Sequence, residues 1–154
     1  MDLEFFEMLY ADQEFCDALG RMTLAAGRFE SNLRTFLSLN GVDVPEDKAT
    51  FGNLISRLRA NDLLSENGVQ VLRGLKEQRN YLTHSLFDLF SARVEETVLP
   101  RSDLVPEDVA VFTEKAWMLE QNLKGLSEVA ETRIDALASG TGSLSHEDAR
   151  LFRP

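Results

Sequence analysis

Apolar side chains recur along this chain in alternating steps of three and four residues, which is the spacing of one face of an α-helix. The first long run predicts a helix from about Asp12 to Leu39, ended by the Asn40-Gly41 pair because both residues tolerate the left-handed cap conformation. Its stripe consists of Phe15, Leu19, Met22, Ala26, Phe29, Leu33 and Phe36. Residues 3–10 predict a short helical arm whose large apolar side chains need a partner surface.

Three further helices follow from capping signals and apolar stripes. Thr50 is a suitable N-cap for a short helix over residues 51–60, and Ser65 for a third helix that continues to about Phe90. Pro106 suits the first turn of the last helix, and the two acids after it favour the positive end of the helix dipole. The last stripe is formed by Val109, Phe112, Ala116, Leu119, Leu123, Leu126, Ala130 and Leu137.

These elements predict an all-α fold, an up-and-down bundle of four to five helices, because no segment alternates convincingly at period two. Residues 1–138 form the predicted single domain. Residues 91–105 lack a helical stripe and are expected to form a long connection, with room for a short β-hairpin. The tail, residues 139–154, begins with Gly, Ser and Thr and is expected to be loosely held.

Length and cysteine content narrow the class of protein. At 154 residues the chain can bury a core of its own. The single cysteine, Cys16, excludes an internal disulfide framework, fits a reducing cytosol and is expected to be a small buried hydrophobe. The N-terminus has acids where a signal peptide needs bases, and no apolar run approaches the roughly 20 residues that span a bilayer. We therefore expect a cytoplasmic protein with no membrane partner.

The formal net charge of −10 argues against an obvious nucleic-acid binder, but the charge is unevenly distributed. Residues 57–101 hold seven basic and six acidic side chains, a balance of +1 between two acidic flanks. A site for a phosphate backbone, if the chain has one, is expected in this middle section.

One position on the predicted third helix breaks its apolar seam. The seam comprises Leu72, Leu75, Leu82, Leu86 and Leu89, and Arg79 fills the missing step. A guanidinium stays charged in proteins and is costly to bury without a partner. On an α-helix Asn80 and His84 lie one above the other, next to Arg79. The three side chains therefore form a corner that could line a groove between helices or between subunits.

This corner suits metal-free cleavage of RNA. A histidine can take the proton of a 2′-hydroxyl as it attacks the adjacent phosphorus, and a guanidinium can stabilise the phosphorane. Asn80 could orient either partner, while Arg73, Lys76 and Tyr81 are candidate RNA contacts. No metal site is visible and no cofactor is required, because the acids are scattered and the chain has only two histidines.

The arrangement Arg79-Asn80-x3-His84 resembles the HEPN superfamily, whose mark is R-x4–6-H, often with a polar residue after the arginine. The order of segments is similar too: AGRFESNLRTFL, FGNLISRLRAND and LKEQRNYLTHSLF on successive helices, then a long last helix. The resemblance implies a metal-independent endoribonuclease of toxin–antitoxin or anti-phage systems, dimerised so that two motifs face one cleft. Arg79, Asn80 and His84 would be its catalytic residues, and Glu30 resembles the acid that some members place near the arginine.

The chain departs from one branch of that family. Where the motif continues H-x-Tyr, the tyrosine is a target of modification by a nucleotidyltransferase antitoxin, but Leu86 occupies the corresponding position here. The resemblance therefore does not support that control mechanism, although another antitoxin or protein partner stays possible.

Two other interpretations compete with the enzyme. In the first, Arg79 is a structural ion paired with Glu30 or another helix acid, and His84 is an ordinary histidine. The bundle is then a catalytically inactive RNA- or protein-binding or regulatory module. In the second, weaker one the protein is a transcriptional regulator, but no basic recognition helix is visible. Trp117 lies just off the last stripe, where it could mark an interface or pack into the core.

Overall fold

The computed structural model describes residues 3–85, 106–140 and 149–152, and these form an all-α helical bundle, which confirms the predicted fold class. Its α-helices are α1 (Leu3–Ala11), α2 (Gln13–Leu39), α3 (Phe51–Ala60), α4 (Glu66–Asn80) and α6 (Pro106–Ala138). A 3-10 turn, η1 (Glu46–Lys48), precedes α3, and a π-helical turn, η2 (Tyr81–Ser85), continues α4. The connection predicted for residues 91–105 lies outside the described residues.

Helix starts follow the predicted caps. The Thr50 side chain accepts a hydrogen bond from the Asn53 amide at 3.3 Å, and Ser65 accepts one from the Gly68 amide at 3.1 Å. Asp12, which the pattern included in the first long helix, instead caps α2 by accepting from the Phe15 amide at 2.9 Å. These bonds satisfy amides that the first turn of a helix leaves without intrahelical partners.

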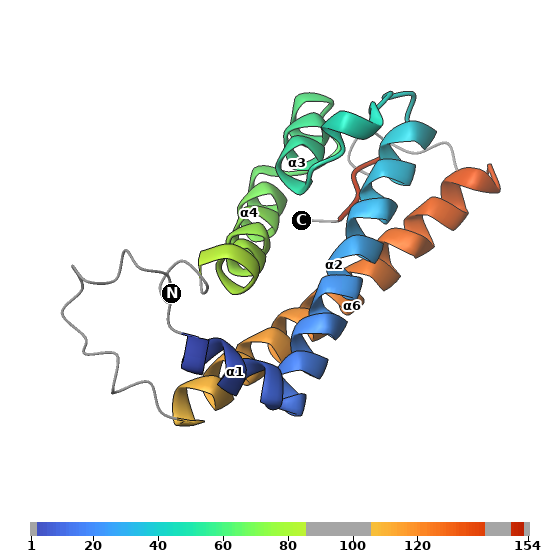
Figure 1. Ribbon diagram of the computed structural model, residues 1–154. Helices are drawn as coiled ribbons and strands as arrows, with labels where there is room; N and C mark the ends of the chain where they lie inside the picture. Colours follow the sequence, from blue (N-terminus) through green and yellow to red (C-terminus); the bar gives the residue numbers. More distant parts are fainter. Residues whose placement is uncertain (1–2, 86–105, 141–148, 153–154) are drawn as a thin grey trace.

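The two long helices, α2 and α6, run side by side along the length of the molecule, while α3 packs against α2, and α4 packs against α3 and α6 (Figure 1). The core between these helices is apolar and excludes solvent. Its fully buried side chains include Met22, Phe29, Leu33, Phe36, Leu54, Leu58, Leu72 and Leu123. On the surface, Arg28 of α2 donates two hydrogen bonds to Glu131 of α6, at 2.8 and 2.7 Å, so an ion pair joins the long helices.

The N-terminal arm finds its partner surface at one end of the bundle. Leu9 of α1 is buried with Phe15 of α2 and Val109 of α6, and these three form a small second cluster. Cys16 lies beside this cluster but is exposed, so the prediction that its thiol is buried was wrong. Its Sγ donates a hydrogen bond to the Leu9 carbonyl at 3.2 Å, which tethers α2 to α1 from the solvent side.

Four residues of the predicted tail pack against the bundle. Leu151 is fully buried, and its amide donates a hydrogen bond to the Leu63 carbonyl at 2.9 Å. Arg150 pairs with Asp62 at 2.9 Å, and Arg133 donates to the Arg150 carbonyl. Residues 149–152 thus differ from the expected loose tail. The Leu151 side chain packs into the core, and the contacts of Arg150 and Arg133 hold the backbone beside it. Residues 141–148 lie outside the described residues.

Candidate functional site

The predicted corner lies where α4 gives way to the π-helical turn. Leu72, Leu75 and Leu82 are buried, so the apolar seam is confirmed at these positions, while Leu86 and Leu89 lie outside the described residues. The α-helix ends at Asn80, earlier than the sequence predicted, and His84 stands in the π-turn. The Thr83 hydroxyl donates to the Arg79 carbonyl at 2.9 Å across this change of geometry.

The π-turn changes the angle around the helix axis between the Arg79 and His84 side chains. A π-helix bonds residue i to i+5 and has more residues per turn than an α-helix. The five-residue step from Arg79 to His84 therefore comes closer to one full turn, and the two side chains diverge less than on a regular α-helix. Single π-turns occur frequently at functional sites.

Arg79 is held by partners from three helices. Its Nη1 is ion-paired with the Glu30 carboxylate of α2, and its Nε donates to the Asn80 side-chain oxygen at 3.2 Å. Its guanidinium carbon lies 5.4 Å from the centre of the Phe51 ring of α3, in reach of a cation–π interaction. The Arg79 and Glu30 side chains are each 23% exposed. These partners explain how an arginine occupies a position in a leucine seam, because the charge is neutralised and still reaches solvent.

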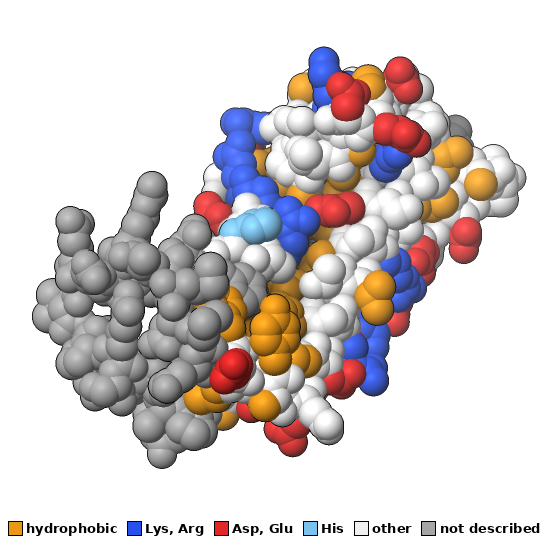
Figure 2. All heavy atoms as spheres, viewed as in Figure 1, with side chains coloured by type: hydrophobic (Ala, Val, Ile, Leu, Met, Phe, Trp, Pro, Cys, Tyr) orange, Lys and Arg blue, Asp and Glu red, His pale blue; other side chains and the backbone are white. Residues whose placement is uncertain are grey.

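His84 and Asn80 complete the corner on its solvent side. His84 is exposed, whereas Asn80 is half-buried and engaged with Arg79. Figure 2 shows a histidine lying against lysine and arginine side chains, with an acidic side chain beyond them. The structure thus brings together Arg79, Asn80 and Glu30, with His84 one π-turn further on the same surface.

The candidate RNA contacts divide into two groups. Arg73 and Lys76 are half-buried on α4 and form no ion pair within the described part of the chain, so their charges are available to a ligand. Tyr81 instead packs against α6: its ring centre lies 6.4 Å from that of Phe112 and 5.9 Å from the Lys115 Nζ. Sequence reasoning missed Lys115, because only the packing of α6 beside the π-turn brings it to Tyr81.

Within the described residues, no group of three or more His, Cys, Asp or Glu side chains is arranged to hold a metal ion. None of their helices combines the length and the apolar character needed to cross a membrane.

No family model matches this chain, and neither a curated protein nor a solved structure matches it significantly. The HEPN resemblance therefore stays a prediction from the motif.

Proposed function

We propose that the corner formed by Arg79, Asn80 and His84 binds RNA and cleaves it without a metal ion. The observation that carries the proposal is the position of an exposed imidazole, one π-turn after a guanidinium that is fixed by Glu30. The Arg79 Nη1 donates to Glu30 and its Nε donates to Asn80. Within the described residues, the Nη2 of Arg79 donates no hydrogen bond. Arg79 thus keeps donors for a phosphate oxygen.

In the proposed reaction, the 2′-oxygen of RNA attacks the adjacent phosphorus. His84 takes the hydroxyl proton, and Arg79 stabilises the extra negative charge of the phosphorane. The bond from phosphorus to the 5′-oxygen then breaks, leaving a 2′,3′-cyclic phosphate and a 5′-hydroxyl once that oxygen is protonated. In a homodimer the second copy of His84 would supply this proton. Asn80 acts as a positioning residue, because it reaches Arg79 rather than the substrate.

The positive charges of Arg73 and Lys76 favour binding of the RNA backbone along α4. Arg73 and Lys76 lie one or two helical turns before Arg79, and the side chain of Lys76 passes close to Gly52 of α3. Without ion-pair partners in the described residues, these two cations can neutralise successive phosphates. Their removal should weaken RNA binding and reduce its salt dependence, while a change at His84 should leave binding almost unaltered.

One observation favours a second function, an inactive RNA- or protein-binding module. The Glu30 carboxylate already neutralises Arg79, and it would repel a phosphate brought to the same guanidinium. In that case the pair serves the α2–α4 contact alone, and His84 has no chemical role.

A cleavage assay on mixed single-stranded and structured RNA in EDTA separates the two functions. We expect wild-type protein to leave 2′,3′-cyclic phosphate ends, and His84→Ala to lose at least about 100-fold in rate, the usual range for an acid–base group. Gln78→Ala, an exposed change on the same helix, serves as the matched control and should cleave normally. RNA binding without cleavage by any form would favour the module.

A further inference from the structure

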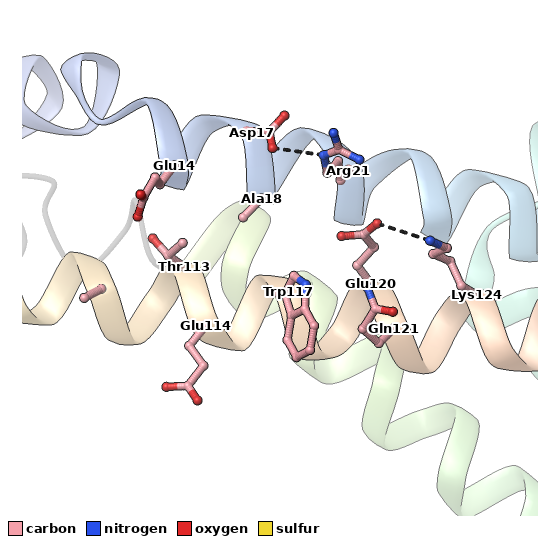
Figure 3. A pocket seen from close by; sticks show the side chains of 11 residues that line it. Glu14, Asp17, Ala18, Arg21, Thr113, Glu114, Trp117, Glu120, Gln121 and Lys124 are labelled. Carbon is pink, nitrogen blue, oxygen red and sulfur yellow. Dashed lines mark hydrogen bonds and ion pairs between the residues drawn. The ribbon is translucent and has the colours of Figure 1, made fainter.

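A concave surface lies between α2 and α6, away from the α4 corner. It is an open groove of about 610 Å³. Figure 3 shows Glu14 of α2 and Glu120 of α6 pointing into the space between the helices, with the Trp117 ring lying along α6. Small side chains, among them Ala18 and Thr113, form part of its lining.

The groove carries an excess of negative charge. Four carboxylates line it against two basic side chains. Both bases already have acidic partners: Arg21 lies 2.9 Å from Asp17, and Lys124 lies 3.9 Å from Glu120. Glu14 and Glu114 form no ion pair within the described residues, so neither carboxylate is neutralised by a direct partner there.

Two side chains of the groove, Trp117 and Glu120, have groups that are available to a ligand. Trp117 is 55% exposed, which is unusual for the largest side chain and contradicts core packing, the alternative in which it fills the interior. The Glu120 side chain is only 8% exposed, yet its closest cation, at 3.9 Å, is too distant for a hydrogen bond. Within the described residues this carboxylate accepts no hydrogen bond, and its oxygens are not fully buried, so they are accessible from the groove.

We infer that this groove binds a basic segment of a protein partner through its arginine or lysine side chains. A cation placed over the indole gains a cation–π interaction, and flanking carboxylates add charge-assisted hydrogen bonds. From Ala110 to Lys124 the groove follows α6 for roughly 21 Å at about 1.5 Å per residue. That length accommodates about six extended residues, more than a single small cation needs. The negative charge disfavours nucleic acid here.

The test is calorimetric titration of the 154-residue protein with the peptide acetyl-Gly-Arg-Gly-Arg-Gly-amide, and with the glutamine analogue of that peptide. We expect the arginine peptide alone to bind. Trp117→Ala and Glu14→Gln should each weaken binding severalfold, and combining them should weaken it at least tenfold. Both sites are exposed, so circular dichroism should show an unchanged fold.

The matched control is Glu77→Gln, which removes one exposed carboxylate on α4, away from the groove. Its affinity should stay within twofold of wild type. An equal loss in Glu77→Gln would mean diffuse attraction by an acidic protein and would overturn the inference. Absence of peptide binding, or a groove closed by a second copy as judged by concentration-dependent mass, would overturn it as well. None of these outcomes depends on RNA cleavage at His84.

Discussion

At the residue scale, the Arg79 side chain combines a structural contact with hydrogen-bond donors that are free for a ligand. It joins α2 to α4 through Glu30, and it presents its remaining donors to solvent beside His84. A role of Arg79 in stability therefore does not exclude a role in RNA cleavage. Its effect on the free energy of unfolding has to be measured separately from its effect on the cleavage rate.

A double-mutant cycle measures the structural part of this role. Arg79→Ala and Glu30→Ala should each reduce the free energy of unfolding by about 1–3 kcal/mol, since hydrogen bonds to charged groups contribute in this range. The double variant should lose less than the sum of both, because neither charge is then left alone. Urea unfolding provides the measurement, and strictly additive losses would show that the pair is not coupled.

His84 should behave differently in the same measurement. Because its side chain is exposed on the π-turn, His84→Ala should change the free energy of unfolding by less than about 0.5 kcal/mol. A loss of several kcal/mol would make the histidine structural and would leave its effect on cleavage uninterpretable.

The surface pair Arg28–Glu131 predicts a pH dependence. Hydrogen bonds from Arg28, and then from Asn32, lower the pKa of the Glu131 carboxyl below its ordinary value. Its contribution to stability is therefore present above the unfolded pKa of about 4.3 and disappears as the pH falls through the lower folded value. Between about pH 5 and pH 3 the wild type should lose more stability than Glu131→Gln. Urea unfolding across this range should show no such difference for Glu46→Gln, an exposed acid on η1.

At the element scale, capping residues in the sequence predict most of the helix ends correctly. Thr50, Ser65 and the Asn40-Gly41 pair mark boundaries that the structure reproduces, since caps depend on side chains within a few residues of the helix end. The π-turn could not be predicted in this way, because periodicity in the sequence continues through it. Its geometry depends on how Leu82 and Tyr81 pack against other helices.

The Ser65 cap supports the helix that carries the candidate site. Ser65→Ala should destabilise the protein by about 0.5–2 kcal/mol, because the Gly68 amide loses its acceptor. Thermal unfolding followed by circular dichroism would detect the shift. Ser31→Ala, an exposed change inside α2, should leave the midpoint nearly unchanged, and an equal shift in both variants would argue against a capping contribution.

At the scale of the whole molecule, the sequence predicted which faces are apolar but not which distant segments meet. The contact of Arg79 with Glu30 is an exception, because the HEPN resemblance and the cost of burying an unpaired guanidinium both pointed to that acid. The groove between α2 and α6, the contact of Lys115 with Tyr81 and the docking of residues 149–152 depend on helix placement. No local pattern encodes that placement.

Leu151 tests whether the docked segment contributes to the core. Leu151→Ala should cost about 2–5 kcal/mol, the range for leucine deletions at fully buried sites. Leu24→Ala, at a position 76% exposed, is the matched control and should change stability by less than about 0.5 kcal/mol. Denaturant unfolding compares them, and a small effect at Leu151 would show that the segment detaches easily.

The pairing of α2 with α6 has a consequence for the protein during its synthesis. The apolar face of α2 is complete at Leu39, but its main partner is complete only at Ala138, 99 residues later. At about 5–20 residues per second, the ribosome needs roughly 5–20 s to produce that stretch. During this interval Met22, Phe29 and Leu33 have no α6 to cover them. The nascent chain therefore presents a long apolar helix face that suits a chaperone.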